Sequence, residues 1–425
     1  MYLHLLMKTS ITLLFLTVSL LVNAQTLEGN YKSPYKKIEA SRPQDLLPLV
    51  LKNSSDSLYN ILNSKEYLWG EVQALLYEFK QYNFSAPAAV TDGRHNFEQA
   101  ERPFLAMIYT GMAICNLVEK YPEFKPQARE EMRWLVTKIQ LPAVSGFITP
   151  HFGAPFGKQP IQQSSVLVHG HFLNLALRYR QAFPSAEFDS IIHKVATALA
   201  RDYGKHSLLP SYPDMFYPAD NIVALAALKN YDRIFKKNIS QKPVETFLTE
   251  TKANYLDKTT ILVSSYVNPK TKTQLAGPRG EATMYGLIYL SMLDYAFARE
   301  QWAKTKQYFI RNLPSLFASN KLAAPYLPMI KSIGSKFYIS LQKPVSYPST
   351  GGDGDSGPVI FGAGTSASGF AIASARALND AETATGFERL AVSVGNPVWV
   401  DNRLYYSNLF HPVGQAIILF GKTLH

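Results

Sequence analysis

The chain has 425 residues, of which 47% are hydrophobic and 12% aromatic, and its formal net charge is +11. This hydrophobic fraction is sufficient for a large folded core. Lysine and arginine are dispersed along the sequence, with only short doublets at Lys36-Lys37 and Lys236-Lys237, so the positive charge does not indicate a nucleic-acid-binding protein. A mild attraction to anionic substrates or to a membrane surface is compatible with it.

The first 24 residues have the pattern of a secretory signal peptide. Lys8 supplies the positive charge, residues 11–22 form a short apolar stretch, and Ala24 ends a small-residue cleavage site. That stretch is too short to span a bilayer, and no later apolar run reaches the roughly 18 residues of a membrane helix. We therefore expect an exported protein, periplasmic or extracellular, without a membrane span.

The rest of the chain is expected to form one folded unit. Residues 25–43 are polar and contain proline, which predicts a flexible lead-in, and residues 44–425 are predicted to be a single domain. Cys115 is the one cysteine, so no disulfide can form within the chain. Because Cys115 lies in an apolar helical pattern, we expect a buried and inert thiol. The sequence predicts neither a metal site nor a cofactor.

Helical periodicity dominates the chain. It begins at about Leu46 and runs with interruptions to Tyr82. Later helices are predicted over about 97–120, 126–140, 163–183, 186–203, 220–231, 242–257, 281–297, 300–312, 366–378, 381–393 and 411–423. The pair 281–297 and 300–312 is expected to turn at Ala298 and Arg299. Strands are predicted only at 260–267 and 336–341.

The lengths of the connections predict the architecture. Connections within a helix pair are mostly short, whereas those between pairs are long: 141–162, 204–219, 258–280, 313–365 and 394–410. In a ring of antiparallel helices, alternate connections fall at the same end, where loops on a rigid scaffold carry functional groups. We therefore predict an all-α fold, an (α/α)6 toroid, with the segment before residue 82 completing the sixth pair. A linear helical solenoid is the structural alternative.

The loop at 210–220 carries two acids among aromatic and proline residues. Asp220 precedes an apolar helix, where it can be a helix N-cap, a catalytic base, or both. Asp214 follows a proline and can bind substrate or simply form a turn. Tyr212, Phe216 and Tyr217 are predicted to form an aromatic wall for the substrate.

His169 and His171 lie near the start of the next helix upstream. Two residues that are two positions apart on a helix point in different directions, so they are poorly placed to bind one metal ion. We expect one histidine to face the mouth of the ring and the other to be buried. His169 is the candidate proton-transfer group, because an imidazole titrates near neutral pH, and His171 is a candidate for substrate binding.

Two further loops enter helices. Arg279 and Glu281 can bind an anionic or hydroxylated substrate, or they can form an ion pair and complement the helix dipole. The glycine-rich segment 349–369 carries Asp353 and Asp355, one of which we expect at the mouth as a catalytic group. Nucleotide binding is rejected because the segment lacks a Walker lysine.

Taken in this order, the motifs resemble the linalool dehydratase/isomerase-like proteins over about residues 95–420. The resemblance rests on His169 at a helix start, Phe216-Tyr217-Pro218-Ala219-Asp220, Gly277-Pro278-Arg279-Gly280 and Asp355-Ser356-Gly357-Pro358. It implies an α/α toroid, export, and cofactor-free acid/base removal and addition of water at an allylic alcohol. His169 then matches the family's helix-start histidine, and Phe216 and Tyr217 match its aromatic wall. The family's two cysteines in the loop before Asp220 are absent, and Ala219 stands about where the second would be.

Three functions remain open at this point. The first is an exported toroid enzyme, a lyase or hydrolase, that acts on a hydroxylated small molecule by acid/base catalysis. The second is a glycan hydrolase or polysaccharide lyase, since paired acids and aromatic residues also suit sugars. The third is a non-catalytic envelope protein that binds a partner or serves as a scaffold. The sequence does not determine the oligomeric state.

Overall fold

A computed structural model gives the fold. It describes residues 44–45, 60–85, 94–313, 337–340, 359–360, 363–395, 397–406 and 412–425. The predicted signal peptide and lead-in, residues 1–24 and 25–43, lie outside the described residues. Asp353 and Asp355 also lie outside them.

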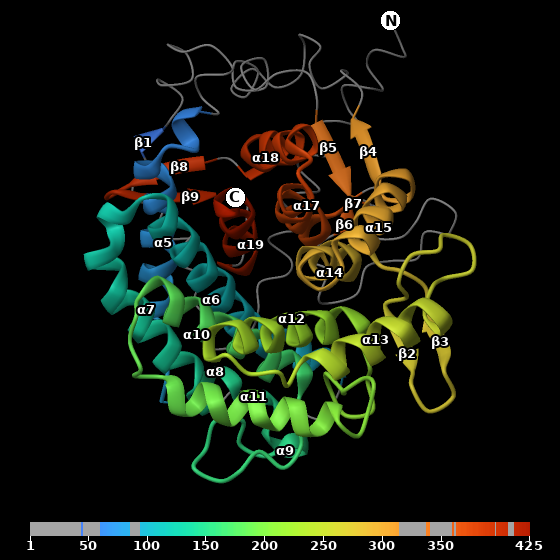
Figure 1. Cartoon of the computed structure of the whole chain (residues 1–425). Helices are drawn as coiled ribbons and strands as arrows, with labels where there is room; N and C mark the ends of the chain where they lie inside the picture. Colours follow the sequence, from blue (N-terminus) through green and yellow to red (C-terminus); the bar gives the residue numbers. More distant parts are fainter. Residues whose placement is uncertain are drawn as a thin grey trace, which may run out of the picture.

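Among the described residues, six helices pack side by side as a closed inner ring (Figure 1). In ring order they are α6 (Arg94–Lys120), α10 (Val166–Ala182), α12 (Pro218–Phe235), α14 (Gly280–Leu293), α17 (Thr365–Ala377) and α19 (Pro412–Thr423). Each contacts the next, and α19 contacts α6. This closure confirms the predicted toroid, because the ends of a linear solenoid would not meet.

A second set of helices surrounds the inner ring. These are α5 (Lys65–Lys80), α7 (Lys125–Ile139), α11 (Asp189–Tyr203), α13 (Gln241–Asn254), α15 (Tyr295–Tyr308) and α18 (Ala381–Gly395). Five of them pack on the inner helix that precedes them in the chain, and α5 packs on α19. The segment before residue 82 therefore completes the sixth helix pair, as predicted.

The predicted turn at Ala298 and Arg299 is wrong, because both residues lie inside α15. The chain turns at Asp294, whose side chain accepts a hydrogen bond from the backbone N–H of Phe297 at 3.0 Å. An aspartate in this position satisfies an N–H group that the first turn of a helix leaves without an intrahelical partner. The cap therefore starts the new helix at Tyr295, five residues earlier than the apolar periodicity indicated.

Small residues let neighbouring inner helices approach closely. A Cβ atom added at Gly170 of α10 would lie 2.7 Å from the Cβ and 2.9 Å from the Cα of Ala224 in α12. At the next crossing, a Cβ on Gly286 of α14 would lie 3.4 Å from that of Ala219. The first distance is too short for any side chain, so glycine at 170 sets the spacing between α10 and α12.

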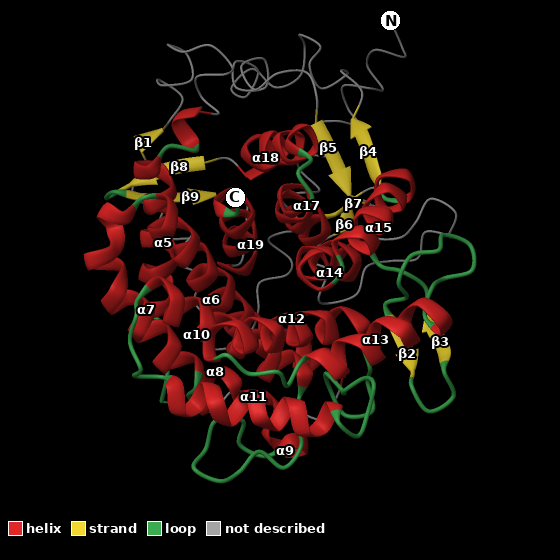
Figure 2. Ribbon diagram, viewed as in Figure 1, coloured by secondary structure: helices red, strands yellow, loops and turns green. Residues whose placement is uncertain are grey.

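Short strands lie at the periphery of the helices (Figure 2). They are β1 (Gln44–Asp45), β2 (Tyr266–Asn268), β3 (Thr273–Ala276), β4 (Ile310–Leu313), β5 (Phe337–Ser340), β6 (Val359–Ile360), β7 (Ala363–Gly364), β8 (Pro397–Val400) and β9 (Arg403–Tyr406). All pairs are antiparallel: β1 with β8, β8 with β9, β2 with β3, β4 with β5 and β6 with β7. The predicted strand at 336–341 is present as β5.

The predicted strand at 260–267 is wrong over most of its length, since β2 begins only at Tyr266. Asp257 organises a turn there instead: its carboxylate accepts hydrogen bonds from the backbone N–H groups of Thr259 and Thr260. Ile261 then adopts a left-handed conformation with φ 58°. Side-chain bonds of this kind compete with strand pairing, which apolar alternation alone cannot reveal.

The seam where the ring closes contains a buried ion pair. Lys422 of α19 meets Glu71 of α5, and neither side chain is more than 2% exposed. Lys422 also lies 3.2 Å from the hydroxyl of Tyr406 in β9 and 3.2 Å from the carbonyl oxygen of Leu62. Burial raises the pKa of Glu71, and the lysine opposes that rise. The last inner helix, α19, and the first outer helix, α5, are therefore joined through charge as well as apolar packing.

The long connections lead into the N-terminal ends of the inner helices. The connection that follows α7 also contains the short helices α8 (Pro142–Ser145), η2 (Gly146–Ile148) and α9 (Thr149–Phe152). A further short helix, η1 (Pro122–Phe124), lies in the short connection between α6 and α7. The backbone N–H of Val166 donates to Pro210, and Phe216 pairs with Val267. Three consecutive long loops thus contact one another at one end. No helix in the described part of the chain is long and apolar enough to cross a membrane.

Candidate active site at the mouth of the ring

Five inner helices build an aromatic floor inside the ring. We use this name for one side chain from each of five inner helices: Tyr109 (α6), His171 (α10), Tyr285 (α14), Phe370 (α17) and Phe420 (α19). The ring centroid of Tyr109 lies 5.9 Å from His171, 5.1 Å from Phe370 and 5.5 Å from Phe420. Tyr285 lies 5.6 Å from Phe370 and 6.2 Å from His171. These contacts connect five of the six ring helices across the axis.

The sixth inner helix contributes Asp220, in the first turn of α12. The side chain is only 4% exposed. One carboxylate oxygen accepts a hydrogen bond from the hydroxyl of Ser211 at 2.5 Å, and the other accepts one from the hydroxyl of Tyr285. Asp220 is not the helix N-cap, because Tyr217 occupies that position and Pro218 and Ala219 precede the aspartate in the first turn. The cap interpretation is therefore wrong, and the carboxylate points to tertiary partners.

Two tyrosines of the aromatic floor, Tyr285 and Tyr109, are held in their neutral form. Burial, followed by the charge of Asp220 and the hydrogen bond to it, raises the pKa of Tyr285 well above its usual value. Burial also raises the pKa of Tyr109, with smaller effects from Tyr289, Asp220 and Glu281. Both phenols therefore stay protonated near neutral pH. The O–H of Tyr285 is used by Asp220, whereas Tyr109 can donate a hydrogen bond to an oxygen of a bound substrate.

The two histidines of α10 occupy different surroundings. Both are 1% exposed, so the expectation that only one is buried is wrong. The ring nitrogens of His169 lie 3.0 Å from the carbonyl oxygen of Ser165 and 3.3 Å from that of Pro155. Nδ1 of His171 is buried without a hydrogen-bond partner among the described residues, and its ring belongs to the aromatic floor. His171, rather than His169, therefore contributes to the floor beside Asp220.

Burial lowers the pKa of both imidazoles. For His171 desolvation lowers the pKa to about 3. For His169 desolvation lowers it to about 4, although the two backbone carbonyls act in the opposite direction. Both rings are therefore neutral at physiological pH. A neutral imidazole can accept a proton, but neither ring titrates near neutral pH, which was the reason for proposing His169 as the proton-transfer group.

The loop before α12 brings its aromatic residues over this end. The hydroxyl of Tyr212 donates to the carboxylate of Glu101 on α6, and the Tyr212 and Tyr217 rings lie 6.3 Å apart. Phe216 pairs its backbone with Val267 of β2. Asp214 is exposed in the turn between Tyr212 and Met215, with φ 56°. For Asp214 the structure therefore supports the turn rather than a place in the floor.

Arg279 and Glu281 meet at the start of α14. Their charged groups are 3.7 Å apart, and the side chains are 21% and 16% exposed. Arg279 is the N-cap residue, and Glu281 lies in the first turn, where a negative charge complements the helix dipole. The pairing foreseen as the structural alternative is thus present, and the partial exposure leaves both side chains at the rim of the mouth.

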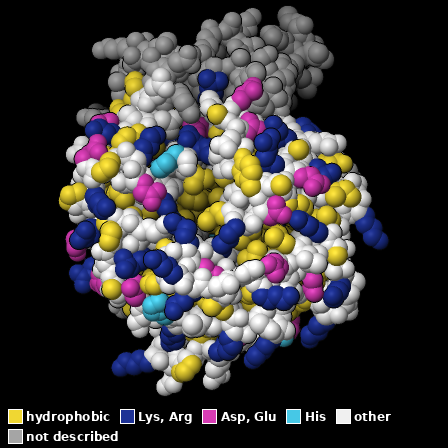
Figure 3. Space-filling model, in the orientation of Figure 1, with side chains coloured by type: hydrophobic (Ala, Val, Ile, Leu, Met, Phe, Trp, Pro, Cys, Tyr) yellow, Lys and Arg dark blue, Asp and Glu magenta, His cyan; other side chains and the backbone are white. Residues whose placement is uncertain are grey.

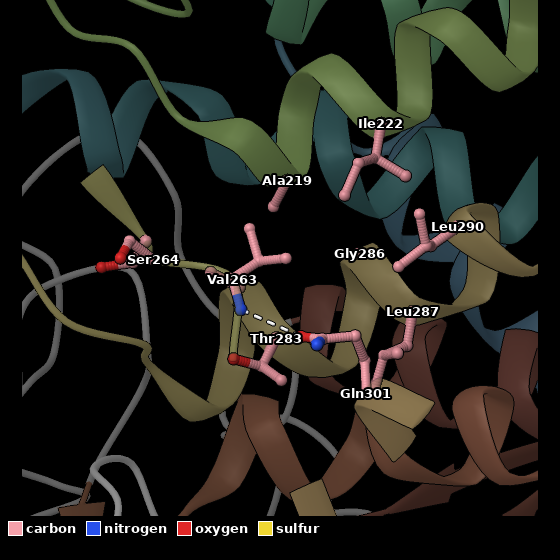
Figure 4. Close-up of a pocket in the computed structure, with 11 residues that line it drawn as sticks. Ala219, Ile222, Val263, Ser264, Thr283, Gly286, Leu287, Leu290 and Gln301 are labelled. Atoms are coloured by element: carbon pink, nitrogen blue, oxygen red, sulfur yellow. Dashed lines mark hydrogen bonds between the residues drawn. The ribbon is translucent and has the colours of Figure 1, made fainter. Parts of the chain in front are cut away.

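A small cavity lies beside Ala219, away from the aromatic floor. It has a volume of about 20 Å³, close to that of one water molecule. Figure 4 shows Ala219 and Ile222 of α12 facing Val263 and the α14 residues Thr283 and Gly286. Gln301 contacts the backbone N–H of Val263 at 3.0 Å. The cavity is too small for a substrate, so the floor is the better candidate site.

Charge on the outer surface is scattered. In Figure 3, lysine and arginine side chains are spread over the face drawn and surround a hollow lined by hydrophobic side chains. Among the described residues, no group of three histidine, cysteine or acidic side chains is arranged to hold a metal ion. The surface thus shows on this face the dispersed charge that the sequence indicated.

Sequence reasoning missed Tyr109, Tyr285, Phe370 and Ser211. One signal was available: His171, Tyr285 and Phe370 are each the sixth residue of their helices, which begin at Val166, Gly280 and Thr365. Equivalent positions in parallel helices of a ring lie at equal depth. Tyr109 and Ser211 carried no comparable signal, because α6 begins further from the floor and Ser211 lies in a loop.

Comparisons with known proteins concern the family and the fold of the chain. The sequence model of a family described as linalool dehydratase/isomerase matches residues 175–410. No curated protein matches the chain. An unsaturated glucuronyl hydrolase specific for heparin is similar in structure, with a TM-score of 0.50 and 10% identity over 84% of this chain and 95% of that one.

Two more solved structures are similar at lower scores. A glycoside hydrolase of family 105 from C. acetobutylicum ATCC 824 has a TM-score of 0.48 and 9% identity, over 84% of this chain and 98% of that one. A novel alpha-amylase from Clostridium perfringens has a TM-score of 0.47 and 9% identity, over 77% and 86%. At such identities the structural likeness concerns the fold alone.

Proposed function

Because the chain belongs to the linalool dehydratase/isomerase family, we propose that it is an exported enzyme that removes water from, or adds water to, a small hydroxylated substrate by acid/base catalysis without a redox cofactor. The observation that carries the proposal is the buried carboxylate of Asp220 beside the aromatic floor. The floor offers apolar surface, a phenolic hydrogen-bond donor in Tyr109 and a neutral imidazole in one place.

Asp220 has the role of electrostatic partner. The first turn of α12 and two hydroxyl donors favour its ionised form. As the carbon–oxygen bond of the substrate breaks, positive charge develops on carbon, and a nearby carboxylate stabilises it. The faces of Tyr109 and Phe370 add a weaker attraction for the same charge. Because the site is buried, bulk water is excluded from it, while the carboxylate and the aromatic faces still stabilise a cation.

His171 and Tyr109 have the proton-transfer roles. Neutral His171 accepts the proton lost from the carbon next to the breaking bond, while Tyr109 donates to the leaving hydroxyl, which departs as water. His171 then returns its proton to Tyr109, whose ring centroid is 5.9 Å away. One carbon–hydrogen and one carbon–oxygen bond break and one carbon–carbon double bond forms, so no electron acceptor is required. Addition of water is the reverse.

Arg279, Glu281 and the aromatic residues Tyr212, Phe216 and Tyr217 complete the proposal as the rim that receives the substrate. One acid of the glycine-rich segment, Asp353 or Asp355, is retained in the proposal as a group at the mouth that orients the substrate. The single-domain organisation of residues 44–425 is also retained as a proposal.

A substrate panel in isotopically labelled water tests the function. The purified protein is incubated with alkenols and with polysaccharides in H₂¹⁸O, and the products are analysed by mass spectrometry. We expect alkenols to lose water and the remaining alcohol to gain ¹⁸O through re-addition. Cleavage of polysaccharides without any change in the alkenols would instead support a glycan hydrolase or lyase. Inertness toward both classes would support a binding or scaffold protein.

A further inference from the structure

His169 lies at the base of the loop 153–165, on a different side of α10 from His171. Its two ring nitrogens contact carbonyl oxygens near the two ends of that loop, at Pro155 and Ser165. The ring of Phe156 packs against it with centroids 5.8 Å apart. Because the positions of residues two apart on a helix differ by about 200°, the two imidazoles serve different surroundings.

A continuous set of buried contacts runs from His169 to Asp220. The carbonyl of Ser165 faces Nδ1 of His169, and the hydroxyl of Ser165 donates to the carbonyl of Ser211 at 2.8 Å. The hydroxyl of Ser211 in turn donates to Asp220 at 2.5 Å. Both serines are 0% exposed. Each residue of the series therefore contacts the next, and both serines are shielded from solvent.

From these contacts we infer that His169 is a positioning residue, which acts through Ser165 and Ser211 to fix the direction of the Asp220 carboxylate toward Tyr285. The inference rests on the proposed function only where it gives the orientation of Asp220 a role in catalysis. The contacts themselves do not depend on the identity of the substrate. It replaces the proton-transfer role of His169 with a geometric one. Ser211 is the last member of the series and the one that touches the carboxylate.

The loop has other anchors, so a change at His169 is not expected to release it. Arg201 donates to the carbonyl oxygens of Ile161 and Gln162 at 2.8 and 3.0 Å. The carboxylate of Asp202 accepts from the backbone N–H of Ser164 at 3.0 Å. These bonds come from α11 and do not involve His169. Substitution of His169 is therefore expected to perturb the contacts that lead to Asp220, while the loop 153–165 stays attached to α11.

Carbon NMR of the tyrosine hydroxyl-bearing carbons tests the inference in the whole protein. The resonance of Tyr285, assigned with a Tyr285→Phe variant, reports its hydrogen bond to Asp220. We expect Ser211→Ala to shift this resonance most and His169→Phe to shift it in the same direction. His169→Asn keeps a donor near the position of Nδ1, so in this variant the Tyr285 resonance should lie close to its wild-type position.

Two matched controls separate positioning from general disturbance. Ser207→Ala removes a hydroxyl from the loop that also carries Ser211, but Ser207 donates its hydrogen bond to Glu250, at 2.7 Å, and not to Asp220. His193→Phe removes a histidine that contacts Tyr231 at 2.9 Å. Neither control should move the Tyr285 resonance. Where a substrate is known, His169→Phe should lower kcat about tenfold with little change in KM, because orientation rather than binding is lost.

The outcomes distinguish this inference from the proposed function. A Tyr285 resonance that stays in place in Ser211→Ala and His169→Phe overturns the positioning role. A resonance that moves in both variants supports it, even if no alkenol is converted. In that case the failure belongs to the proposed chemistry alone. Loss of turnover in His169→Phe and His169→Asn alike, with an unmoved resonance, would return His169 to a direct catalytic role.

Discussion

Two buried carboxylates at different places in the ring are held in opposite ways. At the mouth, Asp220 accepts hydrogen bonds from the hydroxyls of Ser211 and Tyr285. At the seam, Glu71 meets the ammonium group of Lys422. Both side chains are 4% exposed or less. The first arrangement surrounds the carboxylate with neutral donors, whereas the second pairs it with a cation.

The difference shows which buried charge is suited to chemistry. A carboxylate held by neutral donors keeps a field that can act on a substrate in a site of low dielectric constant. A carboxylate bound to lysine has little field left, and its value lies in fixing which helices meet. We therefore expect changes at the seam to affect folding and changes at the mouth to affect turnover.

The largest expected effect is on stability, from Lys422→Met. This substitution leaves Glu71 buried without its cation, which typically costs about 3–5 kcal/mol of unfolding free energy. Denaturant unfolding measures it. The double variant Glu71→Gln with Lys422→Met should recover most of the loss, because both charges are then removed. A loss below about 1 kcal/mol in the single variant would show that the pair does not hold the seam.

Asp220→Asn tests the mouth. It removes the charge while keeping the size of the side chain, so we expect a folded protein whose kcat is lower by about 10² or more. Asp189→Asn is the matched control, because Asp189 also lies in the first turn of a helix but pairs with Arg180. Turnover that survives in Asp220→Asn together with a lower melting temperature would make Asp220 a structural residue.

Cys115 provides a buried titratable group that takes part in neither arrangement. Its side chain is 0% exposed, and burial raises the pKa of the thiol to about 12. Cys115→Ser buries a hydroxyl and should cost about 1–3 kcal/mol in urea unfolding. Turnover per folded molecule should stay the same. Inactivation of a folded variant would identify the thiol as a nucleophile.

The smallest effect concerns pH and His171. The unfolded imidazole has a pKa near 6.5, and the folded one has a pKa of about 3. Between these values the unfolded chain binds the extra proton, so the unfolding free energy falls as the pH is lowered from about 6.5. From pH 6.5 to 5 the wild type should lose about 1–2 kcal/mol more than His171→Phe. Parallel curves from urea unfolding would place His171 in a solvated site.

Much of the fold was contained in local sequence patterns. Apolar periodicity located the ring helices, and the contrast between short and long connections predicted the pairs and the closed toroid. These features depend on neighbouring residues, so they survive without knowledge of the partner surfaces. Where a side chain competed with that pattern, as Asp294 and Asp257 do, the predicted boundary or strand was wrong.

The candidate site depended on tertiary structure. The sequence indicated Asp220 and the histidine pair, but it did not distinguish His171 from His169, because both follow the same helical pattern one residue either side of Gly170. Tyr285 lies 65 residues from its partner Asp220. Only closure of the ring brings such positions to one axis, where burial and mutual contact, rather than local sequence, determine their protonation and their roles.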